Sequence, residues 1–451
     1  MKRKQTTARS EEFMQNLLAT TCASWKWPQY KQAIAADIFV TEAQPDSKRK
    51  NSGFLVEAAK NAGLQQLRKL LSASFVEWKY YSVLTQAFHG IIGFSFYNPE
   101  QKFERAAEGG LLLVVAGNIG PKQSQMVYMK LFPESALIYS SSNNFKGKHG
   151  SVSFEILDDS CKASIRISDA EGFDLCCVVE GDNPTSPWHP RPLVDTQLNP
   201  LPGGHWIVHN RIPVGQSSGK ISMSRNFIEC LRVQGTCSSA TPGLMGRPNG
   251  LDANSYWLEK SSQLEKIPET NIWEWKDAPA YFEHSYGLHP LTSQGWDFFF
   301  APLEGCFGGA VLQSYKNSMS LKQLDIFWID QETNEKRSTS FSGDNLKIEW
   351  HEKEYDRKLK AWIPIERRLH AANESYSVQL TQRIHSTLRF LRPQTLAVRC
   401  FFIGEQIGTA SWTLRDKHGK EIQKITNTLA GGEVAYWRFP SLGKHTQPFP
   451  V

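Results

Sequence analysis

Apolar residues at every second position most strongly limit how this chain can fold. Ala163, Ile165 and Ile167 alternate with polar residues, and the same alternation recurs at 173–179, 324–328 and 410–414. Successive side chains of a β-strand point to opposite faces, so a period of two predicts strands with one buried face. Turn-forming residues separate these segments at hairpin spacing. The pattern predicts a mostly β protein whose antiparallel strands form barrels or sandwiches.

The first 74 residues follow a different pattern. Ser10 is followed by two glutamates and then by Phe13, Leu17 and Leu18, which is typical of a helix start. Apolar residues near helical spacing recur between 54 and 75. At roughly 100–200 residues per domain, the chain is long enough for two further domains. We therefore predict a helical N-terminal appendage over 1–74, a β domain over 75–290 and a second β domain over 291–451.

The composition is that of a soluble globular protein, with 40% hydrophobic and 21% charged residues. The net charge of +6 is small and the basic runs are short, which argues against nucleic acid as a partner. No apolar run approaches the ~20 residues of a membrane-spanning helix, so no stable membrane insertion is expected. The eight cysteines contain no Cys-x-x-Cys pair, which favours a reduced, cytoplasmic protein.

Aromatic residues reach 12%, and many lie in four clusters beside ionisable groups. Aromatic side chains favour strands and also line pockets for apolar ligands. An acid or a histidine on an aromatic wall costs free energy unless it is hydrogen-bonded or neutral, and burial raises a carboxyl pKa toward the range of a proton donor. The alternative is that these polar groups are satisfied locally and only hold the domains together. The candidate residues are Glu77, Trp78, Tyr81, Trp188, Glu283, His284, Tyr286, Trp296, Asp297 and Phe298.

Strand periodicity also predicts how these candidates face. If 281–287 is a strand, Phe282, His284 and Tyr286 share one face and Glu283 lies on the other. In the same way, Phe298 and Asp297 lie on opposite faces of a strand at 295–300.

Three motifs resemble those of a known family. They are Glu77-Trp-x-x-Tyr81, Tyr281-x-Glu-His-x-Tyr-Gly287 and Gly295-Trp-Asp-Phe-Phe299. Together they resemble the double lipocalin-like family, which includes carotenoid 1,2-hydratase (hydroxyneurosporene synthase), fungal Diels–Alderases and tocopherol cyclase. The resemblance covers roughly residues 75–440. It implies two lipocalin-like antiparallel β-barrel domains in tandem, joined near 288–294, with a ligand cavity in or between them.

The resemblance also carries Glu77, Trp78, His284, Tyr286, Trp296 and Asp297 onto motif positions. The chain departs from the hydratase at one place. That enzyme has an acidic residue on the strand after Gly-Trp-Asp, whereas the segment 309–315 has none. This difference argues against hydration by the same residue.

These observations leave several functions open. The first is a cofactor-independent cyclase, pericyclic and Diels–Alderase-like or proton-initiated, acting on a hydrophobic polyene, terpenoid or polyketide of secondary metabolism. The second is a carotenoid-type hydratase. The third is a non-catalytic lipid- or pigment-binding protein, and a purely structural protein is a further alternative.

In the proton-initiated version, Glu283 or Asp297 is the acid and His284 positions it or relays the proton. Trp78, Tyr286 and Trp296 flank the cation, while Glu77, Tyr81, Trp188 and Phe298 line the pocket. In the pericyclic version, the cavity lowers the barrier by restricting the substrate's conformations.

Two weaker patterns are better explained without chemistry. Gly215-Gln-Ser-Ser-Gly219 fits a nucleophile motif, but strand-like residues follow it, so we predict a hairpin turn there. His205 and His209 lie on an expected strand, where positions four apart are roughly 13 Å from each other. We therefore predict no metal and no cofactor. A hydrophobic small molecule is the expected partner, and the chain is expected to be a monomer or a homodimer.

Overall fold

The computed structural model describes residues 75–97, 110–120, 124–141, 143–159, 161–182, 193–194, 206–228, 256–258, 270–288, 293–301, 307–315, 318–356, 361–392 and 400–438. The predicted helical appendage at 1–74 lies outside the described residues. No helix in these ranges is long and apolar enough to span a membrane.

The first sheet is formed by the N-terminal part of the described chain. Its strands are β1 (Phe75–Leu84), β2 (Phe88–Tyr97), β3 (Gly110–Ile119), β4 (Ser124–Pro133), β5 (Leu137–Tyr139), β6 (Phe145–His149), β7 (Val152–Asp158), β8 (Lys162–Asp169), β9 (Phe173–Glu180), β10 (Leu193–Val194), β11 (Trp206–Ser224), β12 (Tyr256–Leu258) and β13 (Thr270–Leu288). Within the described residues these 13 strands are ordered β12-β4-β3-β2-β1-β13-β11-β9-β8-β7-β6-β5, and β10 pairs with β11.

The second sheet is formed by the C-terminal part. Its strands are β14 (Ser293–Phe300), β15 (Phe307–Tyr315), β16 (Ser318–Ile329), β17 (Lys336–Ser342), β18 (Leu346–Asp356), β19 (Ala361–Ala372), β20 (Tyr376–Arg392), β21 (Cys400–Asp416) and β22 (Glu421–Arg438). In the described ranges, the order is β17-β16-β15-β14-β22-β21-β20-β19-β18. Short helical turns occur at η2 (Glu134–Ala136), 225–228 and η3 (Gly343–Asn345).

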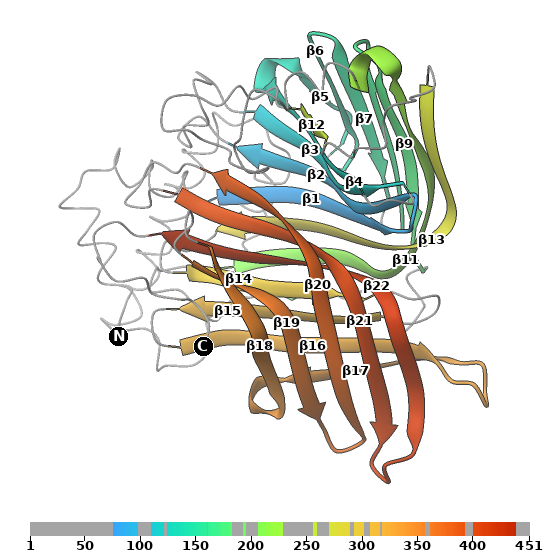
Figure 1. Ribbon diagram of the computed structural model, residues 1–451, viewed down its shortest axis with the longest axis vertical. Coiled ribbons are helices and arrows are strands. Elements are labelled where there is room, and N and C mark those ends of the chain that lie inside the picture. Colours follow the sequence, from blue (N-terminus) through green and yellow to red (C-terminus); the bar gives the residue numbers. More distant parts are fainter. Residues whose placement is uncertain are drawn as a thin grey trace, which may run out of the picture.

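Both sheets are antiparallel and curled. In the first sheet β4 approaches β6, and in the second β16 approaches β18. Figure 1 shows the two sheets packed against each other, with β1 of the first beside β22 of the second. The predicted fold class, mostly β with two barrel-like parts, is confirmed. β13 ends at Leu288 and β14 begins at Ser293, and the predicted domain boundary at 290/291 lies between them but stays a prediction.

The predicted alternation accounts for the burial of the strands. Ala163, Ile165 and Ile167 on β8 are buried, and Phe173 to Val179 on β9 alternate in the same way. Apolar side chains form three large clusters: one inside the first sheet, one inside the second, and one between the sheets. The cluster between the sheets contains side chains from both of them, and the candidate site lies beside it.

The predicted hairpin turn at Gly215–Gly219 is wrong. β11 runs through this segment, with register shifts between Ile212 and Gly215 and between Ser217 and Gly219. A Cβ on Gly219 would lie 2.4 Å from the carbonyl oxygen of Cys176. Glycine is needed here because two strands approach closely, and not because the chain reverses.

A second close approach joins β2 to β3. A Cβ on Gly90 would lie 2.3 Å from the carbonyl oxygen of Ala116, whereas one on Gly93 would meet nothing nearer than 3.9 Å. We expect Gly90→Ala to lower the free energy of unfolding by about 1–3 kcal/mol, the usual cost of overpacking. Urea denaturation measures this, with Gly93→Ala as the matched control. Equal stability of the two variants would contradict the close-packing argument.

Candidate functional site

Strands β1 and β13 carry most of the predicted site residues. They pair with Lys79 opposite His284 and Tyr80 opposite Glu283. Neighbouring side chains on each strand point to opposite sides, so one face enters the first sheet's interior and the other faces the second sheet. The predicted opposite facing of Glu283 and His284 is confirmed, as is that of Asp297 and Phe298.

The structure therefore separates the predicted residues into three places. Glu77, Tyr81 and His284 lie inside the first sheet. Trp78, Glu283 and Phe298 lie between the sheets. Asp297 lies inside the second sheet. Trp188 lies outside the described residues, and only the backbone of Tyr286 and Trp296 is described.

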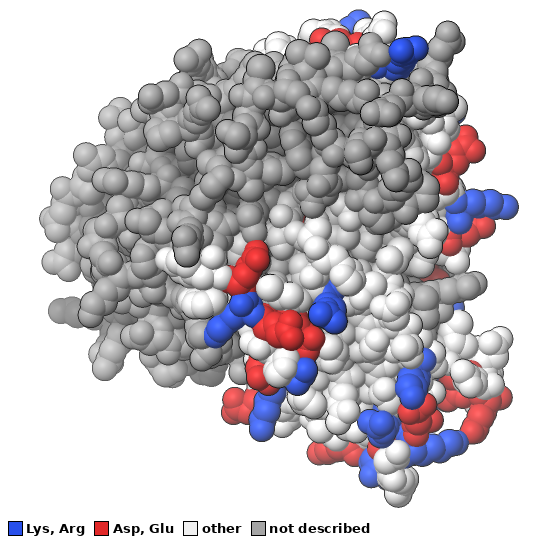
Figure 2. Space-filling model, viewed as in Figure 1, with Lys and Arg blue, Asp and Glu red and all other residues white. Residues whose placement is uncertain are grey.

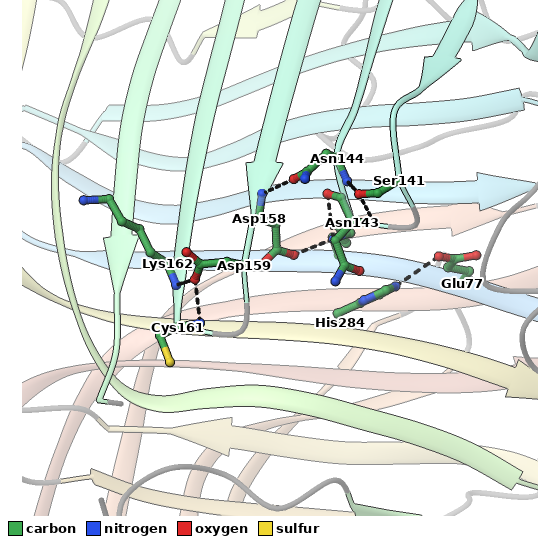
Figure 3. A network of polar contacts seen from close by, with 10 residues as sticks. Glu77, Ser141, Asn143, Asn144, Asp158, Asp159, Cys161, Lys162 and His284 are labelled. Atoms are coloured by element: carbon green, nitrogen blue, oxygen red, sulfur yellow. Dashed lines mark hydrogen bonds and ion pairs between the residues drawn. The ribbon is translucent and has the colours of Figure 1, made fainter. Parts of the chain in front are cut away.

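Inside the first sheet, two buried pairs lie close together. His284 Nε2 is 3.0 Å from Glu77 Oε1, and Lys79 Nζ donates to Asp158 Oδ2 at 2.5 Å. Figure 3 shows His284 and Glu77 pointing toward each other beneath the Asn144–Asp158 contact. Burial raises the pKa of Glu77 to about 8, against the opposing effect of Lys79. Burial lowers the pKa of His284 well below its usual value. Both shifts favour the neutral form of the pair, with the proton on the carboxyl group.

The hydroxyl of Tyr81 lies in the same interior. Its ring stacks on Phe282 with the centroids 4.6 Å apart. The hydroxyl is buried and has no hydrogen-bond partner among the described residues, and the same is true of Tyr139. Buried hydroxyls of this kind are ordinarily satisfied by a water molecule. Tyr81 thus faces the barrel interior and is separated from the space between the sheets.

Inside the second sheet, Asp297 is enclosed by donors. Arg367 Nε donates to Asp297 Oδ1 at 2.8 Å, and Trp350 Nε1 donates to Oδ2 at 2.7 Å. Arg367 also donates to the side-chain oxygens of Gln382 and Gln406. Both carboxylate oxygens of Asp297 accept hydrogen bonds and one faces a guanidinium. This arrangement favours a structural role for Asp297 over proton donation.

Between the sheets, Glu283 is also arranged as an acceptor. Trp78 Nε1 and Ser285 Oγ donate to its Oε1 at 2.8 Å each, and Tyr281 OH donates to Oε2 at 2.6 Å. Donors of this kind favour the ionised form of a carboxyl group. Glu283, the first predicted acid, therefore lies on the expected face. Its surroundings suit an ionised carboxylate better than a proton donor.

Glu405 on β21, which no sequence motif indicated, lies in surroundings that suit a general acid. It is 5% exposed, and Tyr80 OH donates to its Oε2 at 3.1 Å. Burial, together with the charge and hydrogen bond of Glu433, raises the pKa of Glu405 well above its usual value. Glu283 adds to this shift. These effects favour the protonated form of Glu405, against the opposing effect of the hydrogen bond from Tyr80.

Glu405 borders a small space between the two sheets. The space measures about 10 Å³, which is roughly the room that one water molecule needs and far less than the roughly 300–1,000 Å³ of pockets for drug-sized ligands. In this conformation it therefore holds no more than a water molecule. Its lining combines a few polar groups with an apolar wall and consists of Tyr80, Ser82, His89, Gly90, Ile91, Ala116, Phe300, Leu388, Glu405, Gln406, Ile407 and Gly431.

An aromatic cluster adjoins this space. Tyr281 stacks on Phe300 with the ring centroids 4.9 Å apart, and Phe298 lies 5.5 Å from Tyr281. Tyr80 meets Phe300 edge-on at 6.2 Å. Aromatic faces attract cations, so this wall is suited to positive charge on a bound molecule.

On the described part of the face shown in Figure 2, basic and acidic side chains are interspersed and no large area carries one charge. Exposed charges of the described residues are also paired, for example Lys336 with Asp182 at 2.6 Å and Lys420 with Glu332 at 2.9 Å. Within the described ranges, no group of three His, Cys, Asp or Glu side chains is placed to hold a metal ion.

No family model and no curated protein matches the chain. Solved structures that are similar over most of its length include the following three. A proposed AttH protein from Nitrosomonas europaea has 14% identity and a TM-score of 0.45, covering 81% of this chain and 93% of that one. Kievitone hydratase from Nectria haematococca has 9% identity and a TM-score of 0.40, covering 82% and 90%. CghA with Sch210972 has 9% identity and a TM-score of 0.38, covering 81% and 89%. Similarity at this level assigns no reaction.

Proposed function

We propose that the protein is a cofactor-independent enzyme that starts the conversion of an unsaturated hydrophobic molecule by donating a proton from Glu405. The substrate class is a polyene, terpenoid or polyketide of secondary metabolism, and the reaction takes place between the two sheets. One observation carries the proposal: the buried carboxyl group of Glu405, whose pKa is raised by burial, borders a small space between the sheets beside an aromatic cluster.

The surrounding residues support each step of this chemistry. When the proton leaves Glu405, the carboxylate that remains accepts a hydrogen bond from Tyr80 OH. The carbocation on the substrate lies near the faces of Tyr281, Phe298 and Phe300. The carboxylate of Glu283, fixed by its three donors, contributes negative charge near the cation and favours the protonated form of Glu405.

The remaining candidates take other roles in this proposal. Trp78 and Phe298 form the wall of the site, whereas Asp297 holds the second sheet together from inside. Glu77, Tyr81 and His284 lie behind β1 and β13, on the side away from the cavity. Trp188, Tyr286 and Trp296 remain predicted substrate-binding residues on sequence grounds.

Deuterium transfer tests the proposal. The full chain is incubated in D₂O with squalene, geranylgeraniol or a linear polyene methyl ketone, and products are analysed by mass spectrometry. We expect a converted probe to gain one deuterium, and Glu405→Gln to slow conversion by about 10²–10⁴-fold, the usual contribution of a general acid. Glu421→Gln, an exposed acid on β22, is the matched control and should behave like the wild type.

Three outcomes contradict this proposal. Conversion by Glu405→Gln at the wild-type rate rules out Glu405 as the proton donor. Product formation without deuterium favours the pericyclic version, in which the cavity only restricts the substrate. A probe that binds and is recovered intact favours the carrier alternative.

A further inference from the structure

His89 borders the same space as Glu405 but comes from the other sheet. It lies on β2, on the opposite face from Phe88, which packs inside the first sheet. The imidazole is 2% exposed, and its Nε2 lies 3.0 Å from the carbonyl oxygen of Ala430 on β22. A carbonyl oxygen only accepts hydrogen bonds, so Nε2 carries the hydrogen. In the neutral ring, the lone pair is then on Nδ1.

The environment keeps this ring neutral. Burial lowers the pKa of His89 to about 4, against the opposing effect of the hydrogen bond to Ala430, and His385 lowers it further. Near neutral pH, Nδ1 is therefore an available base. Glu405, on the other side of the same space, is shifted in the opposite direction. Two ionisable groups whose pKa values are pushed apart in one site form the usual arrangement of a general acid and a general base.

The side-chain oxygen of a polar neighbour of His89 has no hydrogen-bond partner among the described residues. Asn118 on β3 is directly opposite His89 in the sheet register, so the two side chains share a face with Cβ atoms about 4.5–5.5 Å apart. Asn118 is buried, and its side-chain oxygen has no hydrogen-bond partner among the described residues. Buried polar atoms are usually satisfied. An acceptor at this position would stabilise an imidazolium formed when Nδ1 takes up a proton.

We propose that His89 ends the reaction by removing a proton from the substrate carbon next to the cation. This inference rests on the proposed function and narrows it to a reaction that forms a new double bond, an isomerisation or a cyclisation, rather than an addition of water.

Each bond broken in the proposed reaction is matched by a bond formed, and each proton is accounted for. The O–H bond of Glu405 breaks, and its proton forms a C–H bond with one alkene carbon. The C–H bond on a neighbouring carbon of the cation then breaks, its electron pair forms the new C=C bond, and the proton goes to His89 Nδ1. The imidazolium returns a proton to the Glu405 carboxylate through solvent. Substrate and product have the same elemental composition, and no oxidant or cofactor takes part.

The ratio of alkene to water adduct among the products tests whether His89 is the base. His89→Gln keeps an N–H group able to reach Ala430 but removes the basic nitrogen. With the same three probes, we expect this variant to form the alkene about 10²-fold more slowly and to release water adducts of the cation instead. Glu405→Gln should stop both products. His370→Gln, an exposed histidine on β19, is the matched control.

The outcomes separate the two proposals. Loss of activity in Glu405→Gln with unchanged products in His89→Gln overturns only the base. Unchanged activity in Glu405→Gln overturns the acid and, with it, the base.

A second measurement does not depend on how the variant folds. In ¹⁵N-histidine NMR of the wild-type protein, we expect His89 to have a protonated Nε2 and a bare Nδ1 between pH 5.5 and 8. The Nδ1–H tautomer, or an imidazolium at pH 7, would overturn the assignment.

Discussion

Arg367→Met is expected to lower the free energy of unfolding by about 3–5 kcal/mol, the usual cost of removing one partner from a buried ion pair. Arg367 is fully buried and donates to Asp297 through Nε at 2.8 Å. In the variant, Asp297 keeps the Trp350 hydrogen bond at 2.7 Å but loses its counter-ion. Gln382 and Gln406 lose their donor as well. Urea denaturation followed by tryptophan fluorescence measures the change.

Two controls separate the buried charge from other effects of this substitution. Arg368→Met removes the neighbouring, partly exposed arginine that pairs with Glu366, and should cost no more than about 1 kcal/mol. Adding Asp297→Asn to Arg367→Met removes the unpaired charge and leaves an acceptor for Trp350, so it should recover much of the loss. No recovery in the double variant would mean that lost packing, and not charge, explains the effect.

Glu77→Gln is expected to stabilise the protein, and increasingly so as the pH rises. The usual carboxyl pKa is 4.5, and burial raises that of Glu77 to about 8. Between these values, the unfolded chain releases the proton and the folded chain keeps it. Stability is therefore lost as the pH rises toward 8. Glutamine does not titrate, so the variant avoids this loss.

The window from pH 6.5 to 8 isolates this effect. His284, whose pKa is lowered by burial, contributes its own loss of stability only as the pH falls below the usual histidine value of 6.5. At about 1.36 kcal/mol per pH unit, the wild type should lose about 2 kcal/mol more than Glu77→Gln across this window. Denaturation curves at several pH values measure the slopes, with Glu274→Gln, an exposed acid on β13, as control. Parallel slopes would show that Glu77 is ionised throughout.

Local periodicity predicted the strands because each strand buries one face whatever its partner is. The alternation at Ala163, Ile165 and Ile167 therefore predicted the burial on β8 directly. It failed at Gly215–Gly219, where local residues favour a turn but two strands in close contact need glycine. The prediction that Glu283 and His284 face opposite sides was right for the same reason, since the face of a side chain depends only on its position along a strand.

The partners of the candidate acids were beyond local analysis. Arg367 is 70 residues from Asp297, and Tyr80 is 325 residues from Glu405. Periodicity shows which side chains share a face, but it does not show which compartment that face meets. One signal could have found Glu405: it lies between Ile403 and Ile407 on an otherwise apolar face of a strand, where an acid is costly unless it is neutral or paired.

β1 and β13 are neighbouring strands of one sheet layer, which separates the interior of the first sheet from the space between the two sheets. Odd-numbered residues of β1 face the barrel interior and even-numbered ones face the second sheet. A single inserted residue in either strand would exchange the two sets of that strand beyond the insertion. In β13, an insertion ahead of Glu283 would move His284 into the space between the sheets and Glu283 into the barrel. Length changes within these strands are therefore confined to pairs of residues, unless a bulge absorbs the extra one, as β11 does between Ile212 and Gly215.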